Sequence, residues 1–288
     1  MDPTFKTIAD LFAVAQPDAD PEVQENTRKK HGATAEESDA LGQMYLGENN
    51  IAEAVRHFKE AIAQRPENDI TSQMNLAAAL DYSDQSPQAL RQYRRALKAQ
   101  ETAAEPHIGL SDAYKRYGRF SDAIRELDHA IEREPHNPYF RIKLAETLRD
   151  AGFPKRSLVA AQAAVMVKPD EAFYHYWLGD QLVAMGEDED ALESLRAAIE
   201  LSPGDDHLFL RVAVPFWRVG RRAEAVKSVR LASDLDPEKH LYHGLLGIML
   251  EEMDLMEEAQ LESKRAEKMD RYDHEVLARL LAEMKIEA

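Results

Sequence analysis

Histidine, carboxylate, serine and cysteine side chains carry most enzyme chemistry, and their spacing in this chain matches none of the usual catalytic arrangements. The ten histidines never form a His-Glu-x-x-His pair, and His240 and His243 have no nearby carboxylate in register to complete a metal site. The chain contains no cysteine, which excludes disulfides, thiolate zinc sites, iron–sulfur clusters and cysteine nucleophiles. It also has no Gly-x-Ser-x-Gly elbow and no glycine-rich phosphate loop. The sequence therefore predicts no catalytic residue, no metal site and no cofactor.

The charge balance narrows the classes of partner. Thirty-six Lys and Arg face 53 Asp and Glu, which gives a net charge of −17 at pH 7. Nucleic acids and anionic membranes attract basic surfaces, so we expect no binding to nucleic acid. No run of about 18 apolar residues and no signal peptide occur, so we expect no direct membrane insertion and a cytoplasmic location.

The elements that would have to position any site recur along the chain with a fixed period. Alanine returns every 34 residues, apart from one first step of 35, at Ala61, Ala96, Ala130, Ala164, Ala198, Ala232 and Ala266. The same register is kept by Pro66, Pro135, Pro169, Pro203 and Pro237. Such a period is typical of arrays in which each unit buries its apolar face only against its neighbours. We therefore divide the chain into seven units: 35–68, 70–103, 104–137, 138–171, 172–205, 206–239 and 240–273.

Each recurring position has a physical role in a pair of helices. Positions are counted from the first residue of each unit. Small residues at positions 8 and 20 predict a close approach of the two helices, and large apolar residues at positions 7 and 11 share one helical face. Position 15 holds Asn49, Asp84, Gly118, Gly152, Gly186, Gly220 and Asp254. These residue types tolerate a left-handed backbone, so we expect the first helix to end there. Proline at position 32 predicts the end of the second helix, because proline lacks an N–H.

This set of positions closely resembles the tetratricopeptide repeat family over 35–273. The resemblance implies an all-α fold, a right-handed superhelical solenoid of helix-turn-helix hairpins. The sequence departs from the family's pattern at two positions, and these departures affect the packing of single hairpins and not the fold. At position 4 the family has a large aromatic residue, and here only Phe209 is one. At position 24 the first two units have the aromatic residues Phe58 and Tyr93, while two later units have the small residues Ala161 and Ser263. The other residues at position 4 are Ser38, Gln73, His107, Arg141, His175 and His243.

In this family the first helix of each hairpin lines a concave groove, mainly through positions 2, 5, 9, 12 and 13, with position 6 at the margin. The resemblance places a protein-binding groove over the last three units, whose members are Phe173, Tyr176, Trp177, Leu210, Arg211, Val214, Trp217, Leu241, Leu245 and Ile248. A contiguous apolar patch with aromatic anchors is typical of an interaction site. Arg211 and Arg218 would orient an acidic end of the bound segment. The alternative is that some of these side chains, Trp177 especially, fill the seam between adjacent first helices.

The same positions in the third and fourth units form a groove charge zone. Its cations are Lys115, Arg116, Lys143 and Arg149, and they alternate with acidic residues. Such a zone would hold a carboxylate or an acidic segment of a partner. Mutual ion pairing between neighbouring helices is the competing interpretation.

Two segments lie outside the repeats. Residues 274–288 carry apolar residues on one helical face and charged residues on the other, which predicts a C-terminal capping helix over the bare end of the array. Residues 1–34 hold an amphipathic helix over about 3–16 and a polar segment. Three interpretations of 1–34 stay open: a degenerate repeat, a detachable helix or a disordered tail. A detachable helix would make a homo-oligomer through residues 3–16.

Together these features predict a non-catalytic protein–protein interaction module, which is a scaffold, an adaptor or an assembly chaperone. It would capture a peptide or a helix of a partner protein in its concave groove. Two alternatives from other classes stay open: a self-assembling structural scaffold and a regulatory subunit of an enzyme complex. The second of these rests on the family resemblance alone.

Overall fold

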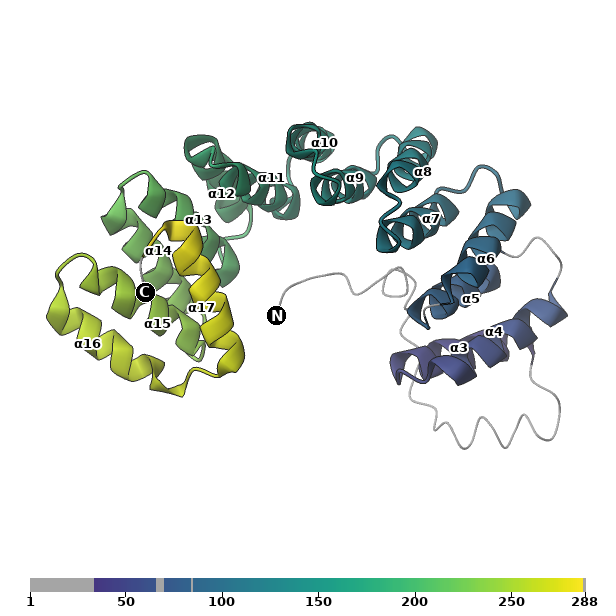
Figure 1. Ribbon diagram of the computed structural model, residues 1–288, viewed down its shortest axis with the longest axis horizontal. Helices are drawn as coiled ribbons and strands as arrows, with labels where there is room; N and C mark the ends of the chain where they lie inside the picture. Colours follow the sequence, from purple (N-terminus) through teal and green to yellow (C-terminus); the bar gives the residue numbers. More distant parts are fainter. Residues whose placement is uncertain (1–33, 66–69, 84, 287–288) are drawn as a thin grey trace. The chain divides into compact units, whose positions relative to one another are not determined.

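The computed structural model describes residues 34–65, 70–83 and 85–286, and all regular structure within these ranges is helical (Figure 1). Most of the helices follow one another in pairs of similar length. The pairs are α3 (Ala35–Gly47) with α4 (Ile51–Gln64), α5 (Ile70–Tyr82) with α6 (Ser86–Ala99), α7 (Glu105–Arg116) with α8 (Phe120–Arg133), α9 (Pro138–Asp150) with α10 (Pro154–Val167), α11 (Ala172–Met185) with α12 (Asp188–Leu201), α13 (Asp206–Arg218) with α14 (Arg222–Leu235), and α15 (His240–Glu251) with α16 (Met256–Arg265). A short 3-10 helix, η1 (Ala266–Lys268), and α17 (Arg271–Met284) follow the last pair.

The chain divides into two compact units, Met1–Phe140 and Arg141–Ala288. The core of the first unit draws its buried apolar residues from α4 to α8. The core of the second unit extends from α11 to the end of α17. Each core is a series of side chains shared between successive helices, as expected for an array of hairpins. The predicted helix over 3–16 and the homo-oligomer through it lie outside the described residues.

The turns inside the hairpins use the left-handed residues that the sequence predicts. Gly118, Gly152, Gly186 and Gly220 have φ between +68° and +81°, and Asn49 and Asp254 have φ of +59°. At the other end of the hairpin, α8, α10, α12 and α14 each stop two residues before the repeated proline. Both boundary predictions are confirmed at these positions, while Asp84 lies outside the described residues.

Small residues bring the paired helices together, as position 8 predicts. A Cβ atom placed on Gly42 would lie 2.5 Å from Cε1 of Phe58, and one on Gly179 would lie 2.6 Å from Cγ of Leu195. Where position 20 is Ser157, its hydroxyl donates a 2.7 Å hydrogen bond to the carbonyl oxygen of Ala145 on the facing helix. The hairpins thus pack at a distance that a larger side chain would not allow.

In two of the units that lack the aromatic residue at position 4, a histidine at that position contacts a carboxylate of its own hairpin. His107 Nδ1 lies 2.8 Å from a carboxylate oxygen of Glu126, and His243 Nδ1 lies 2.7 Å from a carboxylate oxygen of Glu262. In both hairpins the carboxylate is 19 residues later, on the second helix. A polar contact therefore joins two helices of a hairpin where the family has an apolar ring.

The last helix differs from the expected cap. It begins at Arg271, earlier than residue 274, and it packs chiefly against α13 and α15. Figure 1 shows α17, in yellow, lying across these two helices. Its buried side chains are Leu277, Leu280, Leu281 and Met284. The sequence pattern identified the apolar face of this helix, but that face covers first helices of the last two hairpins.

Candidate functional site

The predicted groove residues of the second unit lie on one side of α11, α13 and α15, which we call the groove face. Five of them are only 0% to 8% exposed, and these are Leu210, Val214, Trp217, Leu241 and Leu245. All five belong to the same core as the buried side chains of α17. These five side chains are therefore enclosed in the core that also receives α17, and the predicted groove residues with accessible surface lie elsewhere on the face.

Direct contacts show how closely α17 approaches the groove face. A Cβ atom on Gly244 would lie 2.7 Å from Sδ of Met269 and 3.3 Å from Cδ2 of Leu277. Gly244 stands at position 5 of its unit, which carries larger residues in the six other units. Those residues are Asp39, Met74, Ile108, Ile142, Tyr176 and Leu210. The absence of a side chain at Gly244 makes room for the segment that leads into α17.

A row of alternating charges crosses the groove face. Arg149 on α9 lies 3.8 Å from Asp180 on α11, and Asp180 lies 2.8 Å from Arg211 on α13. Arg211 in turn donates a short hydrogen bond to the carboxylate of Glu283 on α17. Burial acts to lower the pKa of Arg211, but Asp180 and Glu283 outweigh it and raise that pKa, so the guanidinium stays charged.

The end of α17 is held by a second arginine. Arg218 Nε donates a 2.6 Å hydrogen bond to the carbonyl oxygen of Glu283, and its Nη1 donates a 2.7 Å bond to the carbonyl oxygen of Val183 on α11. The last carbonyls of a helix lack partners within the helix, and a cation there also offsets the negative end of the helix dipole. The acidic end that Arg211 and Arg218 orient is thus part of the chain itself.

The two tryptophans have different surroundings. Trp217 is 6% exposed and belongs to the core, and the guanidinium of Arg222 lies 4.9 Å from its ring centroid. Trp177 on α11 is only partly buried, and the guanidinium of Arg149 lies 4.9 Å from its ring centroid. Phe173 and Tyr176 on the same helix are also partly exposed, as is Ile248 on α15. The accessible aromatic part of the groove face is therefore on α11.

The four cations of the groove charge zone are divided between the two units. Lys115 and Arg116 belong to the first unit, and Lys143 and Arg149 to the second. Arg116 pairs with Asp81 at 3.0 Å and Lys143 lies 4.0 Å from Glu146. Together with the contact of Arg149 with Asp180, these distances match the interpretation that the charges pair between or within neighbouring helices.

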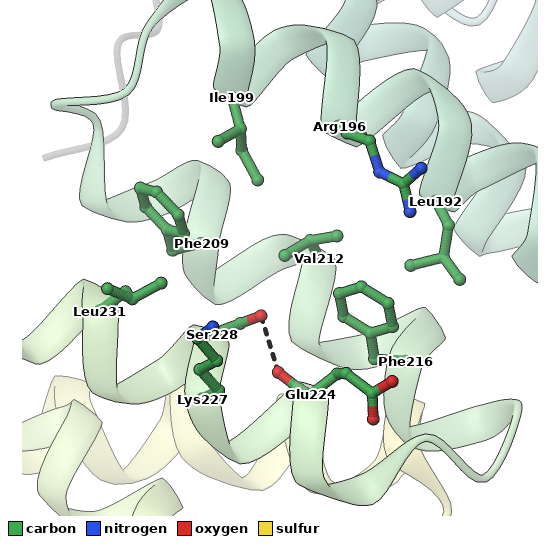
Figure 2. A pocket seen from close by; sticks show the side chains of 10 residues that line it. All are labelled: Leu192, Arg196, Ile199, Phe209, Val212, Phe216, Glu224, Lys227, Ser228 and Leu231. Atoms are coloured by element: carbon green, nitrogen blue, oxygen red, sulfur yellow. Dashed lines mark hydrogen bonds between the residues drawn. The ribbon is translucent and has the colours of Figure 1, made fainter.

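An apolar hollow of about 250 Å³ lies among α12, α13 and α14 (Figure 2). It is lined by Leu192, Arg196, Ile199, Phe209, Val212, Phe216, Glu224, Lys227, Ser228 and Leu231. The one hydroxyl, on Ser228, donates to the carbonyl oxygen of Glu224 at 2.9 Å, and the Glu224 carboxylate lies 3.0 Å from Arg221. The hydrogen bond from Arg221 lowers the pKa of Glu224, so it stays ionised and is not poised as a general acid.

A second hollow, of about 390 Å³, lies in the first unit and is mainly basic. Its lining residues are Arg94, Leu97, Lys98, Glu101, His107 and Arg133. Arg94 donates to the Tyr114 hydroxyl at 2.7 Å, and Arg133 donates to the carbonyl oxygen of Glu101 at 3.2 Å. Part of this charge is therefore already engaged within the unit.

Metal binding and membrane insertion each need a recognisable arrangement of side chains. In this part of the chain, no cluster of three or more His, Asp or Glu side chains is arranged to hold a metal ion. Among the helices that the structure describes, none combines the length and apolar character needed to span a membrane.

Sequence reasoning missed three residues that shape the site: Asp180, Gly244 and Glu283. Asp180 and Glu283 are unremarkable as single acidic residues, because only the fold brings them to either side of Arg211. Gly244 did carry a signal, since glycine occurs at position 5 in no other unit. A small residue at a position that normally lines the groove predicts that something approaches the backbone there.

Two sequence profiles, both described as tetratricopeptide repeat, match residues 83–145 and 142–206. No curated protein matches the chain.

Several solved structures are similar in fold. The C-terminal part of a TPR repeat-containing protein from Cytophaga hutchinsonii is 15% identical, with a TM-score of 0.60 over 76% of this chain and 90% of that chain. MamA from residue 41 onwards, from Desulfovibrio magneticus RS-1, is 21% identical, with a TM-score of 0.53 over 59% of this chain and 96% of that chain. Pseudomonas aeruginosa pilF is 17% identical, with a TM-score of 0.53 over 73% of this chain and 97% of that chain. At these identities the likeness concerns the fold alone.

Proposed function

Because the chain is a tetratricopeptide repeat protein, we propose that it captures a peptide or a helix of a partner protein on the groove face of its second unit. Its fold is that of a protein–protein interaction module. Within that class we assign it the role of a non-catalytic scaffold, adaptor or assembly chaperone in the cytoplasm. Capture of this kind needs no cofactor.

The observation that carries this proposal is the partial exposure of three aromatic residues on α11, namely Phe173, Tyr176 and Trp177. The last helix, α17, packs chiefly on α13 and α15, so its apolar side chains are buried there and not against α11. Aromatic side chains that remain in contact with water on a groove face are typical anchors for a partner, because their burial supplies much of the binding energy.

Charged groups beside the aromatic residues would set the orientation of the partner. The guanidinium of Arg149 lies both over the Trp177 ring and 3.8 Å from Asp180. A partner segment that covers the Trp177 ring would therefore lie beside the Arg149 guanidinium and the Asp180 carboxylate. Apolar burial would supply affinity and these charges would supply register.

The test compares two full-length variants with the wild type in affinity capture from the native host. We expect Trp177→Ala to reduce recovery of the partner by at least about tenfold, as for the loss of an aromatic anchor. Tyr272→Ala is the matched control, because Tyr272 is an aromatic residue on the outer side of α17 that is 68% exposed. Quantitative mass spectrometry measures recovery, and a thermal melt verifies that both variants stay folded. Equal recovery by the wild type and Trp177→Ala would place the binding site elsewhere.

A further inference from the structure

The helix α17 contacts the groove face in the way that a bound helix would. Its buried residues Leu277, Leu280, Leu281 and Met284 follow the spacing i, i+3, i+4 and i+7. This spacing is the one by which an amphipathic helix places its anchors in an apolar groove. The receiving residues on α13 and α15 belong to the same core, so the groove face accepts a helix by apolar burial.

Polar contacts fix the direction in which the helix lies. Glu283, at the sixth residue after Leu277, pairs with Arg211, and its carbonyl oxygen accepts a hydrogen bond from Arg218. Both arginines act at the C-terminal end of α17, where a cation stabilises a helix. A helix placed on this face in the opposite direction would present its positive end to the two guanidinium groups.

The end of α17 lies next to α11, the helix that carries the three partly exposed aromatic residues. Arg218 donates to Glu283 of α17 and also to Val183 of α11, so the end of α17 is one side chain away from α11. The chain then leaves the helix through Lys285, which has φ of +59°. On the same face Arg211 joins Glu283 of α17 to Asp180 of α11, three residues after Trp177.

We infer that α17 is an exchangeable occupant of the groove face, and that the partner supplies a longer amphipathic helix that replaces it. The partner helix carries apolar residues at i, i+3, i+4 and i+7 and a carboxylate at i+6, and it continues onto α11. This inference rests on the proposed function. It adds the chemistry of the partner helix and states that α17 covers the groove face until the partner replaces it.

A second copy of the chain is the less favoured occupant. It offers the same helix that α17 already provides, so exchange between copies gains no new contact. A tethered segment acts at an effective concentration of roughly millimolar, which a second copy does not reach at ordinary protein concentrations. A longer helix gains contacts on α11 that α17 does not make, and these contacts shift the equilibrium toward exchange.

The experiment uses full-length protein and two fluorescent synthetic peptides. The short peptide has the sequence of residues 270–286. The long peptide has the sequence of 270–284 followed by about two further turns of helix whose leucines continue the same apolar face. Fluorescence anisotropy gives the Kd of each peptide, and circular dichroism gives the helix content and melt of each variant.

Weakening the hold on α17 in the protein should strengthen binding of the short peptide. We expect Glu283→Ala to lower its Kd about tenfold, because the internal helix then competes less well. Gly244→Ala should act in the same direction, because its new methyl group meets Met269. Glu275→Ala is the matched control, since Glu275 is an exposed residue of α17 that pairs with Arg271 of the same helix at 3.0 Å. The control should bind the short peptide as the wild type does.

The long peptide tests the extension onto α11. We expect it to bind the wild type about tenfold more tightly than the short peptide, and Trp177→Ala to remove that gain without changing binding of the short peptide. Unchanged short-peptide binding in both Glu283→Ala and Gly244→Ala would overturn the inference. So would a loss of helix in both variants well beyond that of α17, because α17 would then be an integral part of the fold. A dimer of the wild type at micromolar concentration, seen by light scattering, would assign the groove face to a second copy.

The two proposals fail in different ways. If the peptides do not exchange but Trp177→Ala still abolishes partner capture, the proposed function stands and α17 is a fixed element. If the peptides exchange but no partner depends on Trp177, α17 is exchangeable and the partner binds elsewhere.

Discussion

At the scale of single residues, the two tryptophans show that the same side chain serves either packing or recognition according to what covers it. Trp217 stands at position 12 and lies in the core, while Trp177 stands at position 6 and remains partly exposed. Each has a guanidinium 4.9 Å from its ring centroid, so the cation does not distinguish them. Trp217 lies on α13 in the core that also holds the buried face of α17, whereas Trp177 lies on α11, and α17 packs chiefly against α13 and α15.

Asp206 provides a prediction about pH. It accepts a 2.5 Å hydrogen bond from Lys239 and a short one from the buried Tyr242 hydroxyl. Burial acts to raise the pKa of Asp206, but these hydrogen bonds and the nearby positive charge outweigh it and hold the pKa below its ordinary value. Its stabilising contribution is therefore present in full above the pKa of an unfolded aspartate, about 3.9, and is lost as the pH falls through the lower folded pKa.

We expect Asp206→Asn to lower the free energy of unfolding at pH 7 by about 1 to 3 kcal/mol. The difference from the wild type should begin to shrink below about pH 4, where the carboxylate of the unfolded chain takes up a proton, and it should be lost below the lower pKa of the folded state. Urea unfolding at the two pH values measures it. Asp236→Asn is the control, because Asp236 is 39% exposed and lies 3.5 Å from the same lysine, and it should cost no more than about 1 kcal/mol. A deficit that stays constant with pH would show that the Asp206 charge contributes nothing.

At the scale of elements, the sequence predicts the hairpins well because their signals are local. A left-handed residue such as Gly186 ends a first helix, and a proline such as Pro203 follows the end of a second helix, whatever the rest of the chain does. The location of α17 had no such signal. Its apolar face fits the bare end of an array or the groove face equally well, and only contacts such as Arg211 with Glu283 decide between them.

The close approach of α11 and α12 gives a test at this scale. Gly179→Ala would place a Cβ atom 2.6 Å from Cγ of Leu195 and 3.3 Å from its backbone nitrogen, so the hairpin must open. We expect a loss of about 1 to 3 kcal/mol of stability, although alanine is the better helix former. Gly47→Ala is the matched control, since a Cβ atom on Gly47 meets nothing within 4 Å, and it should stabilise by up to about 1 kcal/mol. Urea unfolding measures both, and a stabilised Gly179→Ala would show that the helices can separate without cost.

At the scale of the molecule, the period and the class of fold follow from the sequence, while the division into two units and the state of the groove face do not. The repeated alanines and prolines run through the boundary near Phe140 without interruption. The net charge of −17 indicates the general character of the surface, but the ion pairs at Asp180 and Asp81 depend on which helices are neighbours. Long-range contacts of this kind are set by the packing of each unit and are not encoded in spacing along the chain.

An array whose hairpins bury only their neighbours' faces should respond locally to a core substitution. Leu195 is fully buried in the second unit, and Leu195→Ala should cost about 2 to 5 kcal/mol there. We expect amide hydrogen exchange to accelerate in α11 to α14 and to stay unchanged in α3 to α6, because the core of the first unit contains none of the contacts removed. Leu261→Ala, at a leucine that is 51% exposed on α16, is the control and should leave both regions unchanged. Equal acceleration in both units would mean that they unfold as one cooperative body, and the groove face would then open only together with the whole chain.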